Sequence, residues 1–196
     1  MRQVIHLIRH GQTAANEARL YCGSSDLPLS ERGAEELRRL AAGSGYPCPA
    51  GCRLCISGML RTRQTAEILF GDSPVEVLRD FREIDFGAFE LKSYEELKDR
   101  ADYQAWLTGD NERNRCPGGE SGEDMVGRIM PAFRVLVDDG RDAIVVSHGG
   151  VIAAILHHLW PESGKSRYEW QPQPGHGWSV VLEDGRPVGC EAIPKK

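Results

Sequence analysis

Residues 3–9 read QVIHLIR and residues 143–147 read AIVVS, and a histidine-glycine pair follows each run directly. Apolar residues occupy nearly every position of both runs, which is typical of strands buried on both faces of a parallel sheet. The carboxyl ends of parallel strands meet at one edge of the sheet, where doubly wound proteins bind their ligands. The sequence therefore predicts that His10 and His148 lie together at that edge.

The rest of the chain alternates between strand and helix patterns. Further strands are predicted at 52–57, 75–78, 178–183 and 188–193, the last two joined by the turn signal Asp184-Gly185. Helices are predicted at 31–42, 60–70, 94–107 and 149–160, and another carries Val126, Ile129, Phe133 and Val137. This alternation predicts an α/β fold, a three-layer α/β/α sandwich with a mainly parallel sheet.

Length and charge limit the class of protein. The 196 residues, 40% of them hydrophobic and 27% charged, suit a single domain over 1–196. Within it, we expect an insert at about 80–120 that covers the carboxyl edge of the sheet. The 24 Lys and Arg against 29 Asp and Glu give a formal net charge of −5. Such a balance offers no basic stripe for a nucleic acid or an anionic membrane, so neither partner is expected.

No run approaches the roughly 18 to 20 continuous apolar residues of a membrane span, and the apolar start of the chain is too short for a signal sequence. A cytoplasmic location is therefore expected, with the six cysteines as free thiols. Cys48, Cys52 and Cys55 form a cluster, but no fourth Cys or His stands at a plausible zinc-site spacing, and their role stays open. The sequence does not indicate an oligomeric state.

Two arginines accompany the two histidines. Arg9 directly precedes His10, and Arg61 lies just past the second predicted strand, where a helix begins. Guanidinium groups bind phosphate or carboxylate through paired hydrogen bonds, and a helix N-terminus also favours negative charge. The four side chains together predict a compact anion-binding site within an acidic protein.

Several segments of the chain together resemble a known family, branch 1 of the histidine phosphatase superfamily, which is also called phosphoglycerate mutase-like. The matching segments are RHGQTAAN at 9–16, Ser57 with RTRQTA at 61–66, REIDFG at 82–87, CPGGESGEDMVGRI at 116–129 and SHGG at 147–150. As an ordered set, each beside a predicted strand end or helix, these motifs are far more specific than any one alone.

The resemblance implies a phosphatase-type enzyme that transfers the phosphoryl group of a small phosphorylated substrate to His10. Arg9, Arg61 and His148 would hold the phosphoryl oxygens, and no metal or other cofactor is implied. Glu83 would act as acid and then as base. Asn16, Thr13 and the backbone N–H of Gly149 would complete the substrate pocket.

Two positions depart from the family pattern. Leu91 stands where the family often has glycine after an aromatic-Glu pair, and Gly58 stands where proline is common. Asp80, Asp85 and Glu90 lie close to Glu83, which is chosen as the acid because the spacing in REIDFG matches the family.

Several functions fit these residues. The leading hypothesis is a metal-independent phosphomonoesterase with a phosphohistidine intermediate, acting on α-ribazole phosphate or on a broad range of metabolites. A phosphoglycerate mutase would use the same motifs but would keep its phosphoenzyme until an acceptor binds. A binding module could sense a phosphorylated ligand without turnover, and a zinc hydrolase could use the histidines as ligands.

Overall fold

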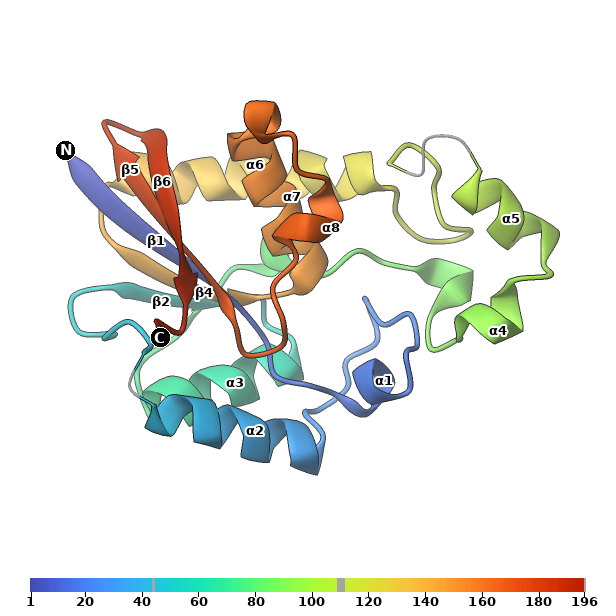
Figure 1. Cartoon of the computed structure of the whole chain (residues 1–196), viewed down its shortest axis with the longest axis horizontal. Coiled ribbons are helices and arrows are strands. Elements are labelled where there is room, and N and C mark those ends of the chain that lie inside the picture. Colours follow the sequence, from blue (N-terminus) through green and yellow to red (C-terminus); the bar gives the residue numbers. More distant parts are fainter. Residues whose placement is uncertain (44, 109–111, 196) are drawn as a thin grey trace.

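The computed structural model describes residues 1–43, 45–108 and 112–195, and its centre is one six-stranded sheet (Figure 1). The strands are β1 (Arg2–Arg9), β2 (Arg53–Ile56), β3 (Glu76–Val77), β4 (Ala143–Ser147), β5 (Gly177–Glu183) and β6 (Arg186–Ile193). Their order is β3-β2-β4-β1-β5-β6. The first four run parallel, and β5 and β6 are antiparallel additions. The predicted mainly parallel sheet is confirmed.

Helices cover both faces of this sheet (Figure 1). On one face, α6 (Gly122–Asp139) and α7 (Gly149–Leu159) share a hydrophobic core with residues of β1 and β4 such as Leu7 and Val145. On the other face, α3 (Leu60–Phe70) packs on Ile8 and Val146, and α2 (Glu31–Ala42) packs against α3. Neighbouring strand residues point to opposite faces, so both faces of β1 and β4 are buried. The three-layer α/β/α arrangement is confirmed.

Local sequence signals explain where the long helices begin and end. The Ser30 side chain accepts a hydrogen bond from the Gly33 amide and starts α2, and Ser121 forms a reciprocal capping box with Asp124 at the start of α6. Gly140, in the left-handed conformation, ends α6. In contrast, α7 starts at His148 without a side-chain cap, which leaves its first amides available to other groups.

The segment between β3 and α6 extends to one side of the sheet and carries short elements, namely η1 (Arg79–Phe81), η2 (Gly87–Phe89), α4 (Tyr94–Leu97) and α5 (Ala101–Leu107) (Figure 1). It has its own buried cluster of Phe89, Leu97, Tyr103 and Cys116. The prediction of one helix over 94–107 is wrong: Arg100 adopts an extended backbone, with ψ of 133°, and its guanidinium pairs with Asp102 in the next helix. The loop GDNERNRCPGG begins in this region, and its residues 109–111 lie outside the described residues.

The chain after α7 returns across the sheet edge before it forms β5. It contains η3 (Pro161–Ser163) and α8 (Arg167–Trp170), and Gly175 then donates its amide to the Arg9 carbonyl at 3.1 Å. A very short α1 (Ala14–Glu17) follows β1 on the other side of this edge. Loops from distant parts of the sequence therefore surround the residues that follow β1 and β4.

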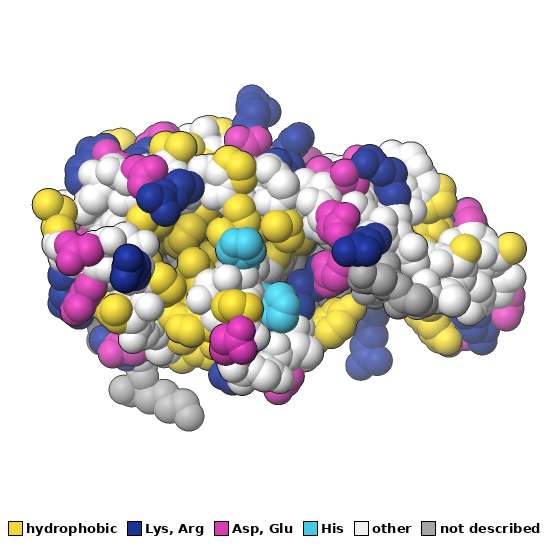
Figure 2. Space-filling view, turned by 90° about the horizontal axis from the view of Figure 1, so that it is seen from above, with side chains coloured by type: hydrophobic (Ala, Val, Ile, Leu, Met, Phe, Trp, Pro, Cys, Tyr) yellow, Lys and Arg dark blue, Asp and Glu magenta, His cyan; other side chains and the backbone are white. Residues whose placement is uncertain are grey.

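The surface carries both signs of charge. On the face shown in Figure 2, Lys and Arg lie interspersed with Asp and Glu. Among the described residues, no helix has the length and apolar character that a bilayer crossing requires.

Both departures from the family pattern fall at positions with positive φ. Leu91 has φ of 56° and donates its amide to the Tyr21 carbonyl at 2.7 Å, so a leucine holds a left-handed turn that favours glycine. Gly58 has φ of 88°, which proline cannot adopt because its ring fixes φ near about −65°.

We predict that Leu91→Gly stabilises the protein by about 0.5–1 kcal/mol. The left-handed conformation costs a leucine about 1–2 kcal/mol, glycine's larger entropy loss offsets part of the gain, and the side chain is 42% exposed. Thermal unfolding of the two proteins measures the difference. Leu60→Gly is the control, because Leu60 is 39% exposed but lies at the start of α3 and should lose stability. A lower melting temperature for Leu91→Gly would contradict the account.

Candidate active site

The structure brings His10 and His148 together. β1 and β4 are adjacent parallel strands whose last residues, Arg9 and Ser147, are paired, and the His10 amide donates to the Ser147 carbonyl at 3.0 Å. The two imidazole centroids lie 5.2 Å apart. His10 is 5% exposed and His148 is fully buried. The edge predicted from the sequence therefore carries both histidines.

Hydrogen bonding fixes the orientation of each ring. His10 Nδ1 lies 2.6 Å from the Gly11 carbonyl oxygen. That oxygen can only accept, so in the neutral ring Nδ1 carries the proton and Nε2 carries the lone pair. His148 Nε2 lies 2.8 Å from Ser57 Oγ, and its Nδ1 has no hydrogen-bond partner among the described residues. In this tautomer His10 Nε2 keeps an unshared lone pair, and His148 Nδ1 is available to a ligand.

The surroundings of both histidines favour their neutral form. Burial, followed by the positive charges of Arg61 and Arg9, holds the pKa of His10 well below its usual range. Burial and then Arg61 do the same to the pKa of His148, with smaller effects from His10 and Arg9. A neutral imidazole is the form that can attack phosphorus.

The two guanidiniums are bound by backbone carbonyls. Arg61 is 1% exposed and donates from Nη1 to the Ser25 carbonyl and from Nη2 to the Gly23 carbonyl, both at 2.8 Å. Arg9 donates from Nη1 to the Pro172 carbonyl at 2.8 Å. The Nε atoms of both arginines are buried without a hydrogen-bond partner in the described structure. Carbonyl oxygens orient these cations but do not neutralise them, so the site strongly favours an anion.

Glu90 holds the loop that binds Arg61. Its carboxylate accepts hydrogen bonds from the amides of Gly23, Ser24 and Ser25 and from the Ser25 hydroxyl, at 2.7–3.2 Å. The carbonyls of the same loop then point to the Arg61 guanidinium. Glu90, a neighbour of the expected acid in the sequence, therefore positions a phosphate-binding candidate instead. The aromatic-Glu pair at 89–90 was its only sequence signal.

Glu83 is the acid that contacts the start of α7. Its Oε2 accepts from the Gly150 amide at 3.0 Å and its Oε1 from the Ile84 amide at 3.1 Å. A Cβ on Gly150 would lie only 2.5 Å from Glu83 Oε1, so a side chain at this position would push the Glu83 carboxylate away from the Gly150 amide. Asp85 is used elsewhere, because its Oδ1 accepts from the Ser24 hydroxyl and the Gly87 amide. Sequence reasoning did not foresee the Gly150 amide as the partner of Glu83.

Gly149 allows Arg9 to approach the N-terminus of α7. A Cβ at this position would lie 3.1 Å from the Arg9 Cζ and 2.6 Å from the Gln171 Nε2. The predicted pocket residue Gly149 therefore lies beside the Arg9 guanidinium, and Gln171 from the returning segment lies on its other side.

Thr13 and Asn16 are bonded to each other. The Asn16 Oδ1 accepts from the Thr13 amide and hydroxyl, both at 3.1 Å, in a capping box around α1. Thr13 is fully buried, so it holds Asn16 rather than facing solvent. Asn16 lines a cleft together with Arg9, Gln12 and Tyr94.

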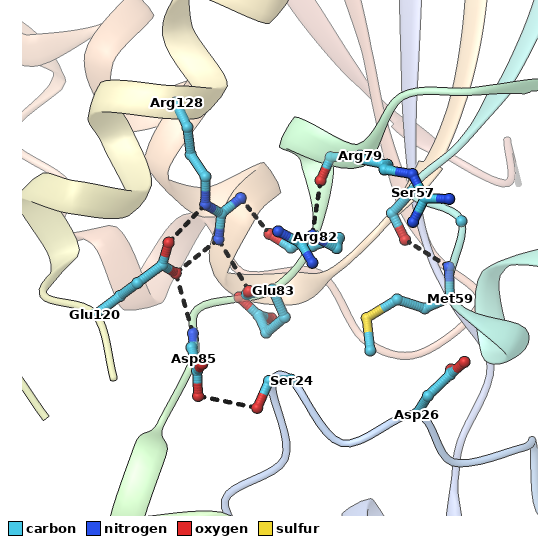
Figure 3. A pocket seen from close by; sticks show the side chains of 11 residues that line it. Ser24, Asp26, Ser57, Met59, Arg79, Arg82, Glu83, Asp85, Glu120 and Arg128 are labelled. Carbon is cyan, nitrogen blue, oxygen red and sulfur yellow. Dashed lines mark hydrogen bonds and ion pairs between the residues drawn. The ribbon is translucent and has the colours of Figure 1, made fainter. Parts of the chain in front are cut away.

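Arg128 on α6 fixes the backbone that carries Glu83 (Figure 3). Its Nη1 donates to the carbonyls of Asp80 and Arg82 at 2.6 and 2.7 Å, and its Nη2 donates to the Glu83 carbonyl at 2.9 Å. Its Nε and Nη2 also bind the Glu120 carboxylate. Beyond the motif at 116–129, which contains both side chains, no sequence signal marks this role.

No group of three or more His, Cys, Asp or Glu side chains in the described parts of the chain is placed to hold a metal ion. Cys48 is exposed, Cys52 is partly buried and Cys55 is buried in β2. All six cysteines are free thiols in the structure.

Comparison with known proteins identifies the family. The profile of the histidine phosphatase superfamily (branch 1) matches residues 5–189, and the chain belongs to this family. An adenosylcobalamin/alpha-ribazole phosphatase of Salmonella typhimurium strain LT2 is 30% identical, with 89% of this chain and 88% of that protein covered. A probable phosphoglycerate mutase of an Enterobacter species is 28% identical over 78% of this chain and 72% of its own. The protein is a phosphatase of the histidine phosphatase type.

Two solved structures show the same fold. The alpha-ribazole phosphatase of Shigella flexneri superposes with a TM-score of 0.79 at 25% identity and covers 96% of this chain and 94% of its own. A structure described as phosphoglycerate mutase from Thermus thermophilus gives a TM-score of 0.71 at 30% identity, covering 97% and 99%.

We predict that Arg128→Lys lowers kcat roughly 10- to 100-fold while KM changes less than about twofold. Lysine cannot hold three carbonyls and Glu120 together, so the acid moves while the phosphate-binding cations stay in place. Steady-state kinetics measure both constants. Arg134→Lys is the matched control on α6, because Arg134 is exposed and its ion pair within the described residues is with Asp138. An equal loss of activity in both variants, or a change confined to KM, would contradict this role.

We also predict that His10 and His148 remain neutral at pH 6. In the unfolded chain, histidine titrates near about pH 6.5. Below that pH the folded protein binds fewer protons than the unfolded chain, so the free energy of unfolding falls as pH falls. The loss reaches about 1.4 kcal/mol per pH unit for each histidine. Imidazole ¹⁵N NMR, assigned with His10→Asn and His148→Asn, and urea unfolding at several pH values measure both effects. An imidazolium signal from either ring at pH 6 would contradict the account.

Proposed function

We propose that this protein is a metal-independent phosphomonoesterase that hydrolyses small phosphorylated metabolites through a phosphohistidine at His10. The observation that carries the proposal is the position of His10, whose Nδ1 lies against the Gly11 carbonyl and leaves Nε2 for a substrate. The buried Arg61 and the half-buried Arg9 act on it, and Glu83 is held by the N-terminus of α7. Nucleophile, anion receptor and acid are then present in one site.

In the first step, the lone pair of His10 Nε2 attacks phosphorus and the bond to the ester oxygen breaks. The protonated Glu83 carboxyl gives its proton to the leaving oxygen, and the alcohol departs. In the second step, the Glu83 carboxylate takes a proton from a water whose oxygen attacks phosphorus. The P–N bond breaks, its electron pair returns to Nε2, and phosphate is released.

Arg9, Arg61 and His148 bind the phosphoryl oxygens in this proposal. Their hydrogen bonds strengthen as charge builds on those oxygens in the transition state, a role that metal ions fill in many phosphoryl-transfer enzymes. Asn16 and the Gly149 amide add donors at the rim. Activity is therefore expected to survive exhaustive dialysis against a chelator, and its loss with recovery on adding zinc would favour the zinc hydrolase.

The relatives suggest two classes of substrate. Alpha-ribazole phosphate is the first to test, because relatives named for it cover most of the chain. Phosphoglycerate mutase activity is the second candidate, because proteins bearing that name match over similar lengths. Assay of 3-phosphoglycerate with 2,3-bisphosphoglycerate separates the two: rapid isomerisation with little phosphate release would establish the mutase.

We predict that Glu83→Gln lowers kcat/KM for an alkyl phosphate by roughly 10²–10⁴ but lowers that for p-nitrophenyl phosphate much less. kcat/KM reports phosphoryl transfer to His10, and only the alkyl alcohol needs a proton to leave. His10→Ala should abolish turnover of both substrates. Glu95→Gln, at an exposed acid of α4, is the control and should match the parent. Equal losses on both substrates would reject Glu83 as the acid, and unchanged activity in His10→Ala would reject the mechanism.

A further inference from the structure

A cavity opens beside Glu83 and is lined in part by residues of the segment 84–107. Its volume is 300 Å³, at the lower end of the roughly 300–1,000 Å³ typical of small-molecule sites. Glu83 accepts a hydrogen bond from the Gly150 amide at the start of α7, and both residues also line this cavity. A group bonded to the oxygen that Glu83 protonates would therefore reach it directly.

Most of the cavity lining is aromatic or aliphatic. Tyr21, Phe86, Trp106 and Tyr168 contribute rings, and Met125, Ala153 and Leu107 contribute aliphatic surface. We call this cavity the aromatic pocket. Three of the rings are packed against one another: Tyr21 meets Phe86 at 5.1 Å and Trp106 at 5.9 Å between centroids. The walls are therefore preformed, and a planar ring could add further edge and face contacts.

Polar side chains also line the aromatic pocket, namely Glu83, Arg167 and Gln171. Gln171 also lies beside Gly149 at the N-terminus of α7. A few polar groups beside an apolar wall can orient a bound ring relative to the phosphoryl site.

The neighbouring cleft has a different character (Figure 3). It measures 280 Å³ and is lined by charged side chains that include Arg79, Arg82, Asp26 and Asp85. An alcohol bearing a carboxylate or a second phosphate suits that cleft better than it suits the aromatic pocket. The charged cleft therefore favours an anionic or polar leaving group, whereas the aromatic pocket favours an apolar one.

We propose that the aromatic pocket binds the leaving alcohol and selects phosphate monoesters whose alcohol carries a planar, largely apolar ring. The inference rests on the proposed function, because it assigns the alcohol side of the same reaction. It also gives residues 84–107 a specificity role, since Trp106 of this segment and Tyr168 of the returning segment both line the pocket.

The test compares two esters whose alcohols have similar intrinsic leaving ability, 2-(2-naphthyl)ethyl phosphate and butyl phosphate. We expect kcat/KM to be at least roughly tenfold higher for the naphthyl ester. Trp106→Ala and Tyr168→Ala should each bring this ratio down by about fivefold or more and leave kcat/KM for butyl phosphate within about twofold of the parent. Tyr168 is 66% exposed, so its removal leaves the core intact even if the Trp106 variant folds poorly.

Tyr94→Ala is the matched control, because Tyr94 is an exposed aromatic residue of the same segment that lines the Asn16 cleft instead. It should leave the ratio unchanged. A parent ratio near one, or a ratio that falls only in Tyr94→Ala, would overturn the proposal. These outcomes concern the subsite alone, since hydrolysis of butyl phosphate that depends on His10 would still support the proposed function. Absence of hydrolysis for both esters would instead contradict the proposed function.

Discussion

The enclosure of two guanidiniums, the buried Arg61 and the half-buried Arg9, by neutral hydrogen-bond partners is the constraint on which the rest of the site depends. A buried cation costs several kcal/mol unless an opposite charge or good hydrogen bonds compensate it. Arg61 and Arg9 are met by carbonyl oxygens, and their Nε groups lack partners among the described residues. The same positive charges help to keep His10 and His148 neutral. In the proposed mechanism, one electrostatic arrangement therefore both attracts a phosphate dianion and favours the neutral imidazole that attacks it.

The sheet positions the two histidines, whereas loops and other segments position the arginines and Glu83. Adjacent parallel strands place the two histidines, and this placement depends only on the pairing of β1 with β4. The cations and the acid depend on distant segments. Glu90 shapes the loop that holds Arg61, the Pro172 carbonyl binds Arg9, and Arg128 secures the backbone of Glu83. Changes far from phosphorus in the sequence can therefore alter the rate without touching the nucleophile.

Much of the fold could be predicted because its signals are local. The continuous apolar runs of β1 and β4 and the capping residues Ser30 and Ser121 specify their elements within a few positions. The prediction of a single helix over 94–107 is wrong because the helix is broken at Arg100. This break is accompanied by the pairing of Arg100 with Asp102, which the spacing of apolar residues cannot reveal. Leu91 shows the same limit, since the tertiary turn imposes a left-handed backbone on a residue that disfavours it.

The site was predictable where side chains carry the chemistry and not where the backbone does. His10, His148, Arg9, Arg61 and Glu83 all stand out in the sequence by their positions after strands or within motifs. The partners that orient them are carbonyls of Gly23, Ser25 and Pro172 and the amide of Gly150, and every residue type offers those groups. Only the three-dimensional structure can show which of them are used.

Trapping the phosphoenzyme is the most direct test of whether His10 carries the phosphoryl group during turnover. The protein would be mixed with a ³²P-labelled substrate, quenched within milliseconds and digested for mass spectrometry. If His10 is the nucleophile, up to one phosphoryl group per chain should be found on His10, in a bond that is acid-labile and base-stable. The His10→Ala variant should carry no label. A burst of released alcohol with no labelled protein, or a label on another residue, would contradict it.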